Sequence, residues 1–305
     1  MSVTTVPSGS SADPWPIRPL LAGLVDDASL VQPRVGADGT APGIDAVVAR
    51  YLSARDGGYG AMLGHLVCPI SRLPALVTEL ARSAPAQPVE VALVVDTGLG
   101  AVPKALSTVF SRSSLLTPRT VETAAPPDVD AMWLERVSEF VPDDVTAVVE
   151  PRRPLGGSPE ETEAWLDAVR RVSEHGCTPK LRSGGPRVSD VPSVEEIERF
   201  LDVTVGEGHG FTAIGLREAV RPSPETGADR GRHGVLNLLV ATARRLGTGE
   251  GTVADALHET SGEALVAEIE AMSVRTVDQV RATFSCCGID PDPMSIREFA
   301  TLGLL

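Results

Sequence analysis

The stretch VEVALVVD, residues Val89–Asp96, decides the fold. It is a short run rich in valine, as is typical of a buried strand in a parallel sheet. It ends in an acidic residue. Similar runs occur along the chain on both sides of it. They are His65–Ser71 (HLVCPIS), Arg119–Ala124 (RTVETA), Val145–Glu150 (VTAVVE), Pro179–Arg182 (PKLR) and Phe211–Leu216 (FTAIGL).

Helical patterns separate these runs. Two of the helices begin with a serine cap followed by glutamates, at Ser158 and Ser193. The runs recur roughly every 25 to 35 residues, which is the length of one strand–helix unit. Repeated units without a hairpin predict a parallel sheet with right-handed crossovers. The helical patterns cover residues 73–83, 101–111, 129–140, 159–175 and 193–205.

Two architectures fit such a sheet, an open doubly wound sheet and a closed (βα) barrel. A doubly wound sheet usually carries a glycine-rich phosphate turn after its first strand, whereas the first run here continues as CPISRLP. We therefore predict an α/β fold, a TIM-like (βα) barrel that is closed or nearly closed, with an incomplete or irregular barrel as the alternative. Because no linker or internal repeat divides the chain, residues 19–305 are predicted to form a single domain.

The N-terminal part is less regular. Residues 1–18 lack the basic start and apolar run of a secretory signal and are expected to be a disordered leader. Residues 17–42 mix apolar residues with turn signals, which indicates a lid or an irregular segment. Asp26-Asp27 within it is expected to cap a turn, although a cation ligand is the alternative. IDAVVARYLS, Ile44–Ser53, suits an amphipathic helix.

The C-terminal part departs from the alternation. Residues 233–275 look helical throughout and are predicted to form an excursion that replaces one strand–helix unit. A last apolar run, Ala282–Gly288 (ATFSCCG), is expected to supply a further strand. A closing helix is then predicted at residues 293–302.

Charge and cysteine usage exclude several classes of partner. The formal net charge of −14 offers no basic surface for nucleic acid. No stretch approaches the roughly 18 apolar residues that a membrane-spanning helix needs. The four cysteines, Cys68, Cys177 and the adjacent Cys286-Cys287, show no CxxC spacing. We therefore expect buried free thiols in a reducing cytoplasm, and neither a nucleic acid nor a membrane as partner.

In a (βα) barrel, chemistry collects at the C-terminal ends of the strands. Strand side chains alternate, so Lys180 and Arg182 should face the barrel interior while Leu181 packs on the outer helices. The same alternation turns Glu150 of the preceding strand inward. We therefore predict a triplet of Glu150, Lys180 and Arg182 inside the barrel mouth. The chain has only one other lysine, Lys104 on a predicted helix.

This triplet suggests a chemistry. Desolvation and the neighbouring arginine would depress the pKa of Lys180, making it a Schiff-base nucleophile, or else it would act as an electrostatic catalyst. Glu150 would serve as acid and base. Arg182, with the amides of Gly184-Gly185, would bind a carboxylate or phosphate. The simpler alternative is a buried, mutually neutralising cluster that only fills the end of the barrel.

Other charged residues at strand ends are weaker candidates. Asp96 and Glu122 are expected to be solvated or to support the site. Asp96 is kept, with Arg217 and Glu218, as a candidate substrate-binding residue. The five histidines never pair at ligand spacing, and no GxSxG, Walker-type loop or HExxH occurs. We therefore expect no metal and no cofactor, with a site of His65, His209 and acids as the remote alternative.

Several motifs in order resemble a family of uncharacterised bacterial proteins from GC-rich genomes. Its pattern is DDA, KLRxGG, a Phe-Pro-Ser helix start, a strand FKATAGLHHPVR, HGFLNLL and ALGLL. The corresponding stretches here are Asp26–Ala28 (DDA), Lys180–Gly185 (KLRSGG), Val191–Ser193 (VPS), Phe211–Leu216 (FTAIGL), His233–Leu239 (HGVLNLL) and Thr301–Leu305 (TLGLL).

This chain departs from the family at one strand. The lysine of FKATAGLHHPVR is absent, with Thr212 nearby, and Arg217 and Glu218 replace the paired histidines. The family's strands are similar to class I aldolase barrels, by analogy alone. If that strand carries the family's chemistry, the resemblance implies that this member has lost the chemistry or changed its substrate. If the KLRxGG strand carries it, the chemistry is kept.

Two functions from different classes follow. The first is a cytoplasmic barrel enzyme, with lyase, aldolase or isomerase chemistry, that acts on a small anionic metabolite. The alternative is a non-catalytic accessory protein on a degenerate barrel, suggested by the missing lysine and histidines and by the loop RPSPETGADRGR at residues 221–232. The expected partners are a small anionic substrate and either further copies of the chain or a protein of the same biosynthetic pathway.

Overall fold

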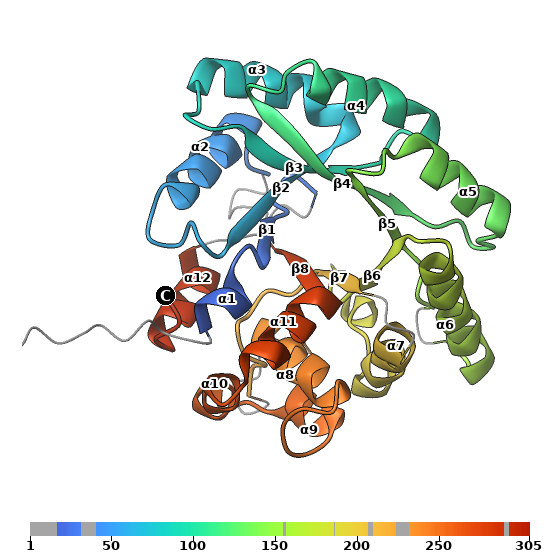
Figure 1. Cartoon of the computed structure of the whole chain (residues 1–305), viewed down its shortest axis with the longest axis vertical. Helices are drawn as coiled ribbons and strands as arrows, with labels where there is room; N and C mark the ends of the chain where they lie inside the picture. Colours follow the sequence, from blue (N-terminus) through green and yellow to red (C-terminus); the bar gives the residue numbers. More distant parts are fainter. Residues whose placement is uncertain are drawn as a thin grey trace, which may run out of the picture.

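The structure is a computed structural model that describes residues 17–31, 41–154, 157–185, 187–206, 210–223, 232–289 and 293–305. In this part of the chain, parallel strands β1 to β8 close into a barrel in chain order (Figure 1). The predicted TIM-like α/β barrel is confirmed, and it is complete. Its strands are β1 (Val25–Asp27), β2 (Leu63–Pro69), β3 (Val89–Val94), β4 (Leu116–Ala124), β5 (Thr146–Glu150), β6 (Thr178–Arg182), β7 (Phe211–Ile214) and β8 (Phe284–Ile289).

The strand β1 closes the barrel and was missed by the sequence analysis. It pairs with β2 on one side and with β8 on the other, where Val25 is opposite Cys287. The expectation of a lid or irregular segment is therefore wrong at this point. With three residues, two of them aspartates, β1 is too short to show an apolar period. A short helix, α1 (Ile17–Leu21), precedes it, and residues 1–16 of the expected leader lie outside the described residues.

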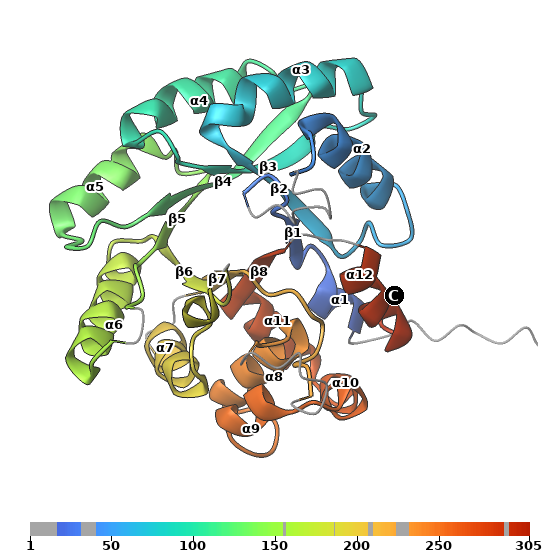
Figure 2. The ribbon, with the colours of Figure 1, turned by 180° about the vertical axis from the view of Figure 1, so that it is seen from behind.

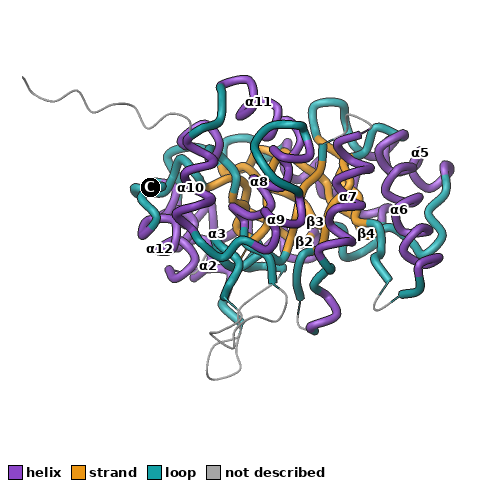
Figure 3. Tube along the Cα trace, turned by 90° about the horizontal axis from the view of Figure 1, so that it is seen from below, coloured by secondary structure: helices purple, strands orange, loops and turns teal. Residues whose placement is uncertain are grey.

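The first seven strands are joined by helices that surround the barrel, as the side view shows (Figure 3). The expected serine caps form: Ser158 and Ser193 each accept a backbone N–H three residues on, and the glutamate there accepts the serine N–H. These helices are α2 (Ile44–Arg55), α3 (Leu73–Ser83), α4 (Val102–Phe110), α5 (Ala131–Phe140), α6 (Pro159–Glu174) and α7 (Val194–Gly206).

The predicted helical excursion lies between β7 and β8, but it is the connection between these strands and does not replace a strand–helix unit, because all eight strands are present. It continues to Thr283, beyond the expected end at residue 275, and the expected last strand follows as β8. Seen from either side, these helices gather next to β7 and β8 (Figures 1 and 2). They are α8 (Val235–Arg245), α9 (Val253–His258), α10 (Gly262–Glu270) and α11 (Val274–Thr283), and α12 (Pro293–Thr301) closes the chain.

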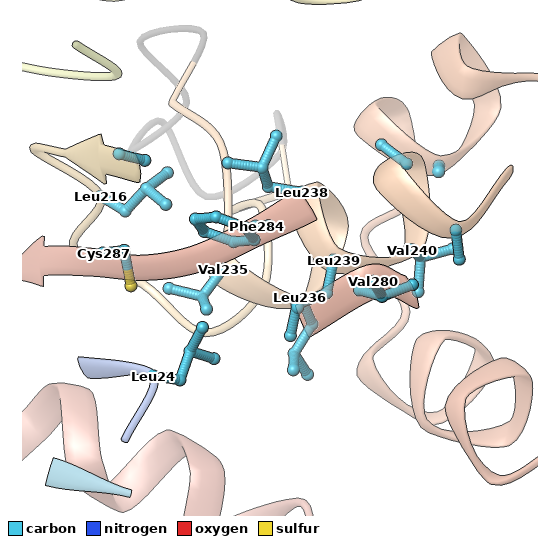
Figure 4. Close-up of a cluster of buried hydrophobic side chains, with 14 of the residues drawn as sticks. Leu24, Leu216, Val235, Leu236, Leu238, Leu239, Val240, Val280, Phe284 and Cys287 are labelled. Carbon is cyan, nitrogen blue, oxygen red and sulfur yellow. The ribbon is translucent and has the colours of Figure 1, made fainter. Parts of the chain in front are cut away.

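The helix α8 is the centre of the larger hydrophobic core. Residues Val235 to Ala243 are buried without interruption, because α9, α10 and α11 pack against the side of α8 that would otherwise face solvent. Close to the strands, α8 side chains meet Leu24, Phe284 and Cys287 (Figure 4). Removing this much apolar surface from water is the main stabilising term for this half of the molecule.

A row of aromatic rings joins the helices to the strands in the same core. Trp165 stacks on Phe200 at 5.8 Å between ring centroids, and Phe200 meets Phe211 edge-on at 5.4 Å. Phe211 then stacks on Phe284 at 4.9 Å. The row runs from α6 through α7 to β7 and β8, and thereby fixes how these elements pack.

The apolar side chains inside the barrel form a cluster separate from those that pack between the strands and the outer helices. Ala28, Val67, Ala92 and Ile214, from four different strands or strand ends, form one small buried cluster. Their sequence neighbours such as Leu93 pack outward on the helices. This alternation defines which residues of each strand face inward, and places Asp26, Glu122, Lys180 and Cys286 inside the barrel.

Candidate functional site

The barrel mouth holds two ion pairs. Lys180 of β6 donates a hydrogen bond from Nζ to Oε2 of Glu122 on β4, and both residues are 5% exposed. Arg182 donates from Nε to Oε1 of Glu150 at 2.5 Å and from Nη2 to Oε2 at 2.8 Å. The predicted triplet is therefore divided between two pairs, and the acid next to Lys180 is Glu122 and not Glu150.

The layers of the barrel explain this exchange of partners. Interior side chains of alternate strands share one layer, so a residue of β6 meets β4 across the barrel before it meets its neighbour β5. Lys180 and Glu122 occupy one such layer. Arg182 and Glu150 lie nearer the C-terminal ends of their strands, where the side chains of β5 and β6 reach each other. The sequence analysis compared neighbouring strands only, and so assigned Glu122 a solvated or supporting place.

Burial and ion pairing have opposite effects on Lys180. Desolvation disfavours the ammonium, but the charge and hydrogen bond of Glu122 outweigh it and raise the pKa of Lys180 above its ordinary value. The expected depressed pKa is therefore wrong in direction. The physical reason is the partner: a carboxylate, and not a guanidinium, contacts the ammonium. Lys180 is held in its charged form.

Both ion pairs line one cavity of about 220 Å³. Its lining residues belong to the C-terminal ends of the strands and to the short segment after β1: Val31, Val94, Val95, Glu122, Thr123, Ala124, Glu150, Lys180, Arg182 and Ile214. Pockets for drug-sized ligands measure roughly 300–1,000 Å³, so this cavity suits a ligand of a few carbon atoms. Apolar walls and four charged groups converge on it.

The two glycines of KLRSGG do not line this cavity. A Cβ on Gly184 would lie 2.4 Å from the carbonyl oxygen of Gly215, and one on Gly185 would lie 2.4 Å from Oδ2 of Asp190. Gly184 therefore permits the close approach of the chain after β6 to the chain after β7. In the structure these glycines allow the chain to pack closely at the mouth, whereas the sequence predicted that their amides bind substrate.

The remaining candidates lie away from the cavity. Arg217 is exposed, and Glu218 forms an ion pair with Arg232 at 2.8 Å. Asp96 accepts hydrogen bonds from the backbone N–H and the hydroxyl of Ser71, so it holds the loop after β2. Among the predicted site residues, only Glu150, Lys180 and Arg182 line the mouth cavity.

A larger hollow of about 630 Å³ lies beside the mouth, between the loops that lead into α6 and α7. Its walls include Arg153, Arg199 and His233. Arg153 is bound to Glu196 at 2.8 Å, and Arg199 forms an ion pair with Glu163. We place the candidate site in the smaller cavity, because it lies at the C-terminal ends of the strands and holds the two ion pairs of the barrel interior.

A second polar cluster lies inside the barrel, formed by residues that do not line the mouth cavity. Asp26, His65 and Cys286 bring a carboxylate oxygen, a ring nitrogen and a thiol sulfur within 4.8 Å of one another. Oδ1 of Asp26 accepts the backbone N–H of His65 at 2.7 Å and lies 3.2 Å from His65 Nδ1. Burial, together with the charge of Asp26, raises the pKa of Cys286 well above its ordinary value. His209, the other histidine of the remote metal alternative, lies outside the described residues.

In the adjacent pairs Asp26-Asp27 and Cys286-Cys287, the two side chains lie on opposite faces of the strand and have different surroundings. Asp27 does cap a turn, as expected, because its Oδ1 accepts the backbone N–H of Ser29 at 3.0 Å. Cys287 faces the apolar outer core, on the opposite side of β8 from Cys286 (Figure 4). All four cysteines are free and buried.

Comparison with known proteins adds little to this description. No protein-family model matches the sequence, and no curated protein matches it. Among solved structures, a chain of pyruvate carboxylase from Rhizobium etli with the allosteric activator acetyl coenzyme A is similar, with a TM-score of 0.40 and 11% identity. The match covers 88% of this chain and 28% of that chain. A likeness this weak carries no argument about function. Among the described residues, no helix is long and apolar enough to cross a membrane.

Proposed function

We propose that the chain is a cytoplasmic enzyme of the lyase or isomerase type that acts on a small anionic metabolite in the mouth cavity. The observation that carries this proposal is the convergence of two ion pairs, from β4, β5 and β6, on one cavity at the C-terminal ends of the strands. This is the place where (βα) barrels build their active sites. The free state of all four cysteines agrees with a reducing compartment.

Arg182 is proposed to bind the anionic group of the substrate. Its side chain is 38% exposed, and Glu150 uses two of the five N–H groups of the guanidinium. The remaining N–H groups are therefore available to a carboxylate or phosphate that enters from the mouth. Glu150 keeps the guanidinium plane oriented toward the cavity.

Glu122 and Lys180 are proposed to carry out proton transfer at the substrate carbon next to a carbonyl or carboxylate. Glu122 would accept the proton as a carboxylate, and the charged ammonium of Lys180 would stabilise the negative charge that develops on the substrate oxygen. Return of the proton to a neighbouring carbon gives an isomerase, and loss of a leaving group gives a lyase. Since Lys180 is held charged, we favour this electrostatic role over imine formation.

The proposal is tested by ligand binding to the full chain. Inorganic phosphate and a panel of two- to four-carbon carboxylates are titrated against the wild type and Arg182→Gln, with thermal shift and calorimetry as readouts. We expect an anion of this panel to bind the wild type and to lose about tenfold or more in affinity in Arg182→Gln. Arg119→Gln is the matched control, because Arg119 forms an exposed pair with Glu90 outside the cavity.

The covalent alternative has its own readout. Borohydride reduction in the presence of small carbonyl compounds, followed by mass spectrometry, would label Lys180 if it forms an imine. Lys104 is exposed and provides the internal control for nonspecific labelling. We expect no adduct at Lys180; a specific adduct would replace the electrostatic role by a Schiff-base mechanism.

One observation favours a second function, a non-catalytic barrel that supports a partner protein of the same pathway. The four charges of the mouth neutralise one another in pairs, as they would if they only filled the barrel end. In that case no member of the panel binds at the mouth, Arg182→Gln behaves like Arg119→Gln, and a stable partner is recovered from the native organism.

A further inference from the structure

The cluster of Asp26, His65 and Cys286 does not line the mouth cavity, and the function proposed there does not use these three residues. Its residues come from β1, β2 and β8, the three strands that meet where the barrel closes. β1 supplies three residues to this closure, and is paired on both sides. The cluster therefore spans the seam of the barrel with one side chain from each strand.

The three side chains offer a donor set that suits a specific metal. A thiolate, an imidazole nitrogen and a carboxylate oxygen are the ligand types that bind Zn²⁺, whereas Mg²⁺ and Ca²⁺ prefer oxygen alone. Zinc bond lengths of about 2.0–2.3 Å place tetrahedral donors about 3–4 Å apart. The donors here lie within 4.8 Å of one another, so a contraction of about one ångström completes the geometry.

The local geometry also leaves one buried polar atom beside the cluster without a described partner. His65 Nδ1 contacts Asp26 Oδ1 at 3.2 Å, so these two groups already lie together. The buried hydroxyl of Thr212 on β7 makes no hydrogen bond to a described residue. Ala213 pairs with Cys287 and the register shifts between Phe211 and Ala213, so Thr212 lies opposite the Ser285-Cys286 segment of β8. Polar atoms buried in this way usually contact water, an ion or a ligand.

A cation would also balance the charges. Asp26 is 2% exposed and Cys286 is 5% exposed, so a metal ion that deprotonates the thiol would have two negative ligands shielded from water. Two negative ligands and one neutral imidazole neutralise a divalent ion. Gly64 makes room for this arrangement, since a Cβ at Gly64 would lie 2.4 Å from Asp26 Oδ1.

We propose that Asp26, His65 and Cys286 form a zinc site that locks the seam between the first and last strands of the barrel. The fourth position is taken by a water molecule that the Thr212 hydroxyl holds. The side chain of His65 is 21% exposed and provides the route by which the ion enters. Because the three residues do not line the mouth cavity and join three strands, the zinc is proposed to be structural and not catalytic.

Metal titration of the full chain tests the proposal. The purified protein is stripped with a chelator and titrated first with Zn²⁺ and then, in a second sample, with Co²⁺. We expect one equivalent of either ion to bind, a thiolate-to-cobalt charge-transfer absorption, and a melting temperature that rises with the free zinc concentration. Less than half an equivalent of bound zinc, or a cobalt complex without the thiolate band, would overturn the proposal.

Adjacent cysteines give a matched pair of variants. Cys286→Ser should weaken zinc binding about 100-fold or more and remove the thiolate band, since loss of a direct ligand exceeds the 10–100-fold effects known for residues behind the ligands. Cys287→Ser should leave both unchanged, because Cys287 faces the outer core. Equal zinc affinity in Cys286→Ser and the wild type contradicts the site. If Cys286→Ser fails to fold, the cobalt spectrum of the wild type compared with Cys287→Ser decides the question.

Discussion

The mouth and the seam of the barrel are two polar regions of one interior, and they differ in how their charges are balanced. At the mouth each cation has its own carboxylate, Lys180 with Glu122 and Arg182 with Glu150. At the seam, Asp26 contacts His65 at 3.2 Å and Cys286 lies beside them, and no lysine or arginine forms an ion pair with the three residues among those that the structure describes. The mouth therefore balances its charges with lysine and arginine, whereas at the seam we propose that a zinc ion does so.

The largest loss of stability is expected when Lys180 loses its carboxylate partner at the mouth. Glu122→Gln leaves the ammonium of Lys180 buried beside a neutral amide, and removal of one partner of a buried pair costs about 3–5 kcal/mol of unfolding free energy. The measurement is urea denaturation. The double variant Lys180→Met with Glu122→Gln should recover most of the loss, because no buried charge remains. A loss below about 1 kcal/mol in Glu122→Gln would contradict this account of the pair.

A smaller effect is expected from steric change at the seam. In Gly64→Ala the new methyl group would lie 2.4 Å from Asp26 Oδ1 and 2.9 Å from the carbonyl oxygen of Gly23. Overpacking of this kind costs about 1–3 kcal/mol. Chemical denaturation in the presence of a chelator measures the loss without metal. Gly58→Ala is the control, because a Cβ at Gly58 has open space around it, and equal effects at both positions would refute the crowding at Gly64.

The more exposed ion pair of the mouth, Arg182 with Glu150, is expected to contribute still less to the free energy of unfolding. Arg182 is 38% exposed, so solvent screens its interaction with Glu150 despite the two hydrogen bonds. Arg182→Gln should therefore lower the free energy of unfolding by about 1 kcal/mol or less. Urea denaturation of Arg182→Gln and Glu122→Gln under the same conditions compares what the two ion pairs contribute to the free energy of unfolding. A loss as large as that of Glu122→Gln would show that exposure does not separate them.

The smallest effect is expected from pH in the neutral range. The pKa of Lys180 is raised in the folded state, so the stability it contributes is fully present below the ordinary value of 10.5 and is lost as pH rises through the folded pKa. Between about pH 6 and 9 the mouth should add no slope to the stability curve. Above pH 10.5 the wild type should lose stability more steeply than the double variant Lys180→Met with Glu122→Gln. Parallel curves would contradict the assignment.

The difference between the two regions also explains what sequence reasoning could predict. Val89–Asp96 and the other apolar runs give the strands, and the inward face of Lys180 and Arg182 follows from alternation. The Lys180–Glu122 pair was missed because the layers of a closed barrel join every second strand. A linear comparison of neighbouring strands cannot show this.

The seam is harder to predict than the mouth. Asp26, His65 and Cys286 stand far apart in the sequence with no ligand spacing, and Asp26 lies on a strand of three residues. Only the ring closure of β1 with β8 brings them together. The one local signal is the alternation of side chains along a strand. It places Asp26 and Asp27 on opposite faces of one strand, and Cys286 and Cys287 on opposite faces of another.

The pairing of β1 with β8 has a consequence for biosynthesis. On the ribosome β1 is the first of the eight strands to emerge and β8 the last, so β1 must wait for its second partner until the other strands have been made. Until then β1 and β7 are the edges of an open sheet, and such edges invite pairing with other chains. The shortness of β1 and the inward charge of Asp26 are features that discourage such pairing. We therefore expect the same three residues that close the ring to disfavour edge-to-edge pairing of the nascent chain.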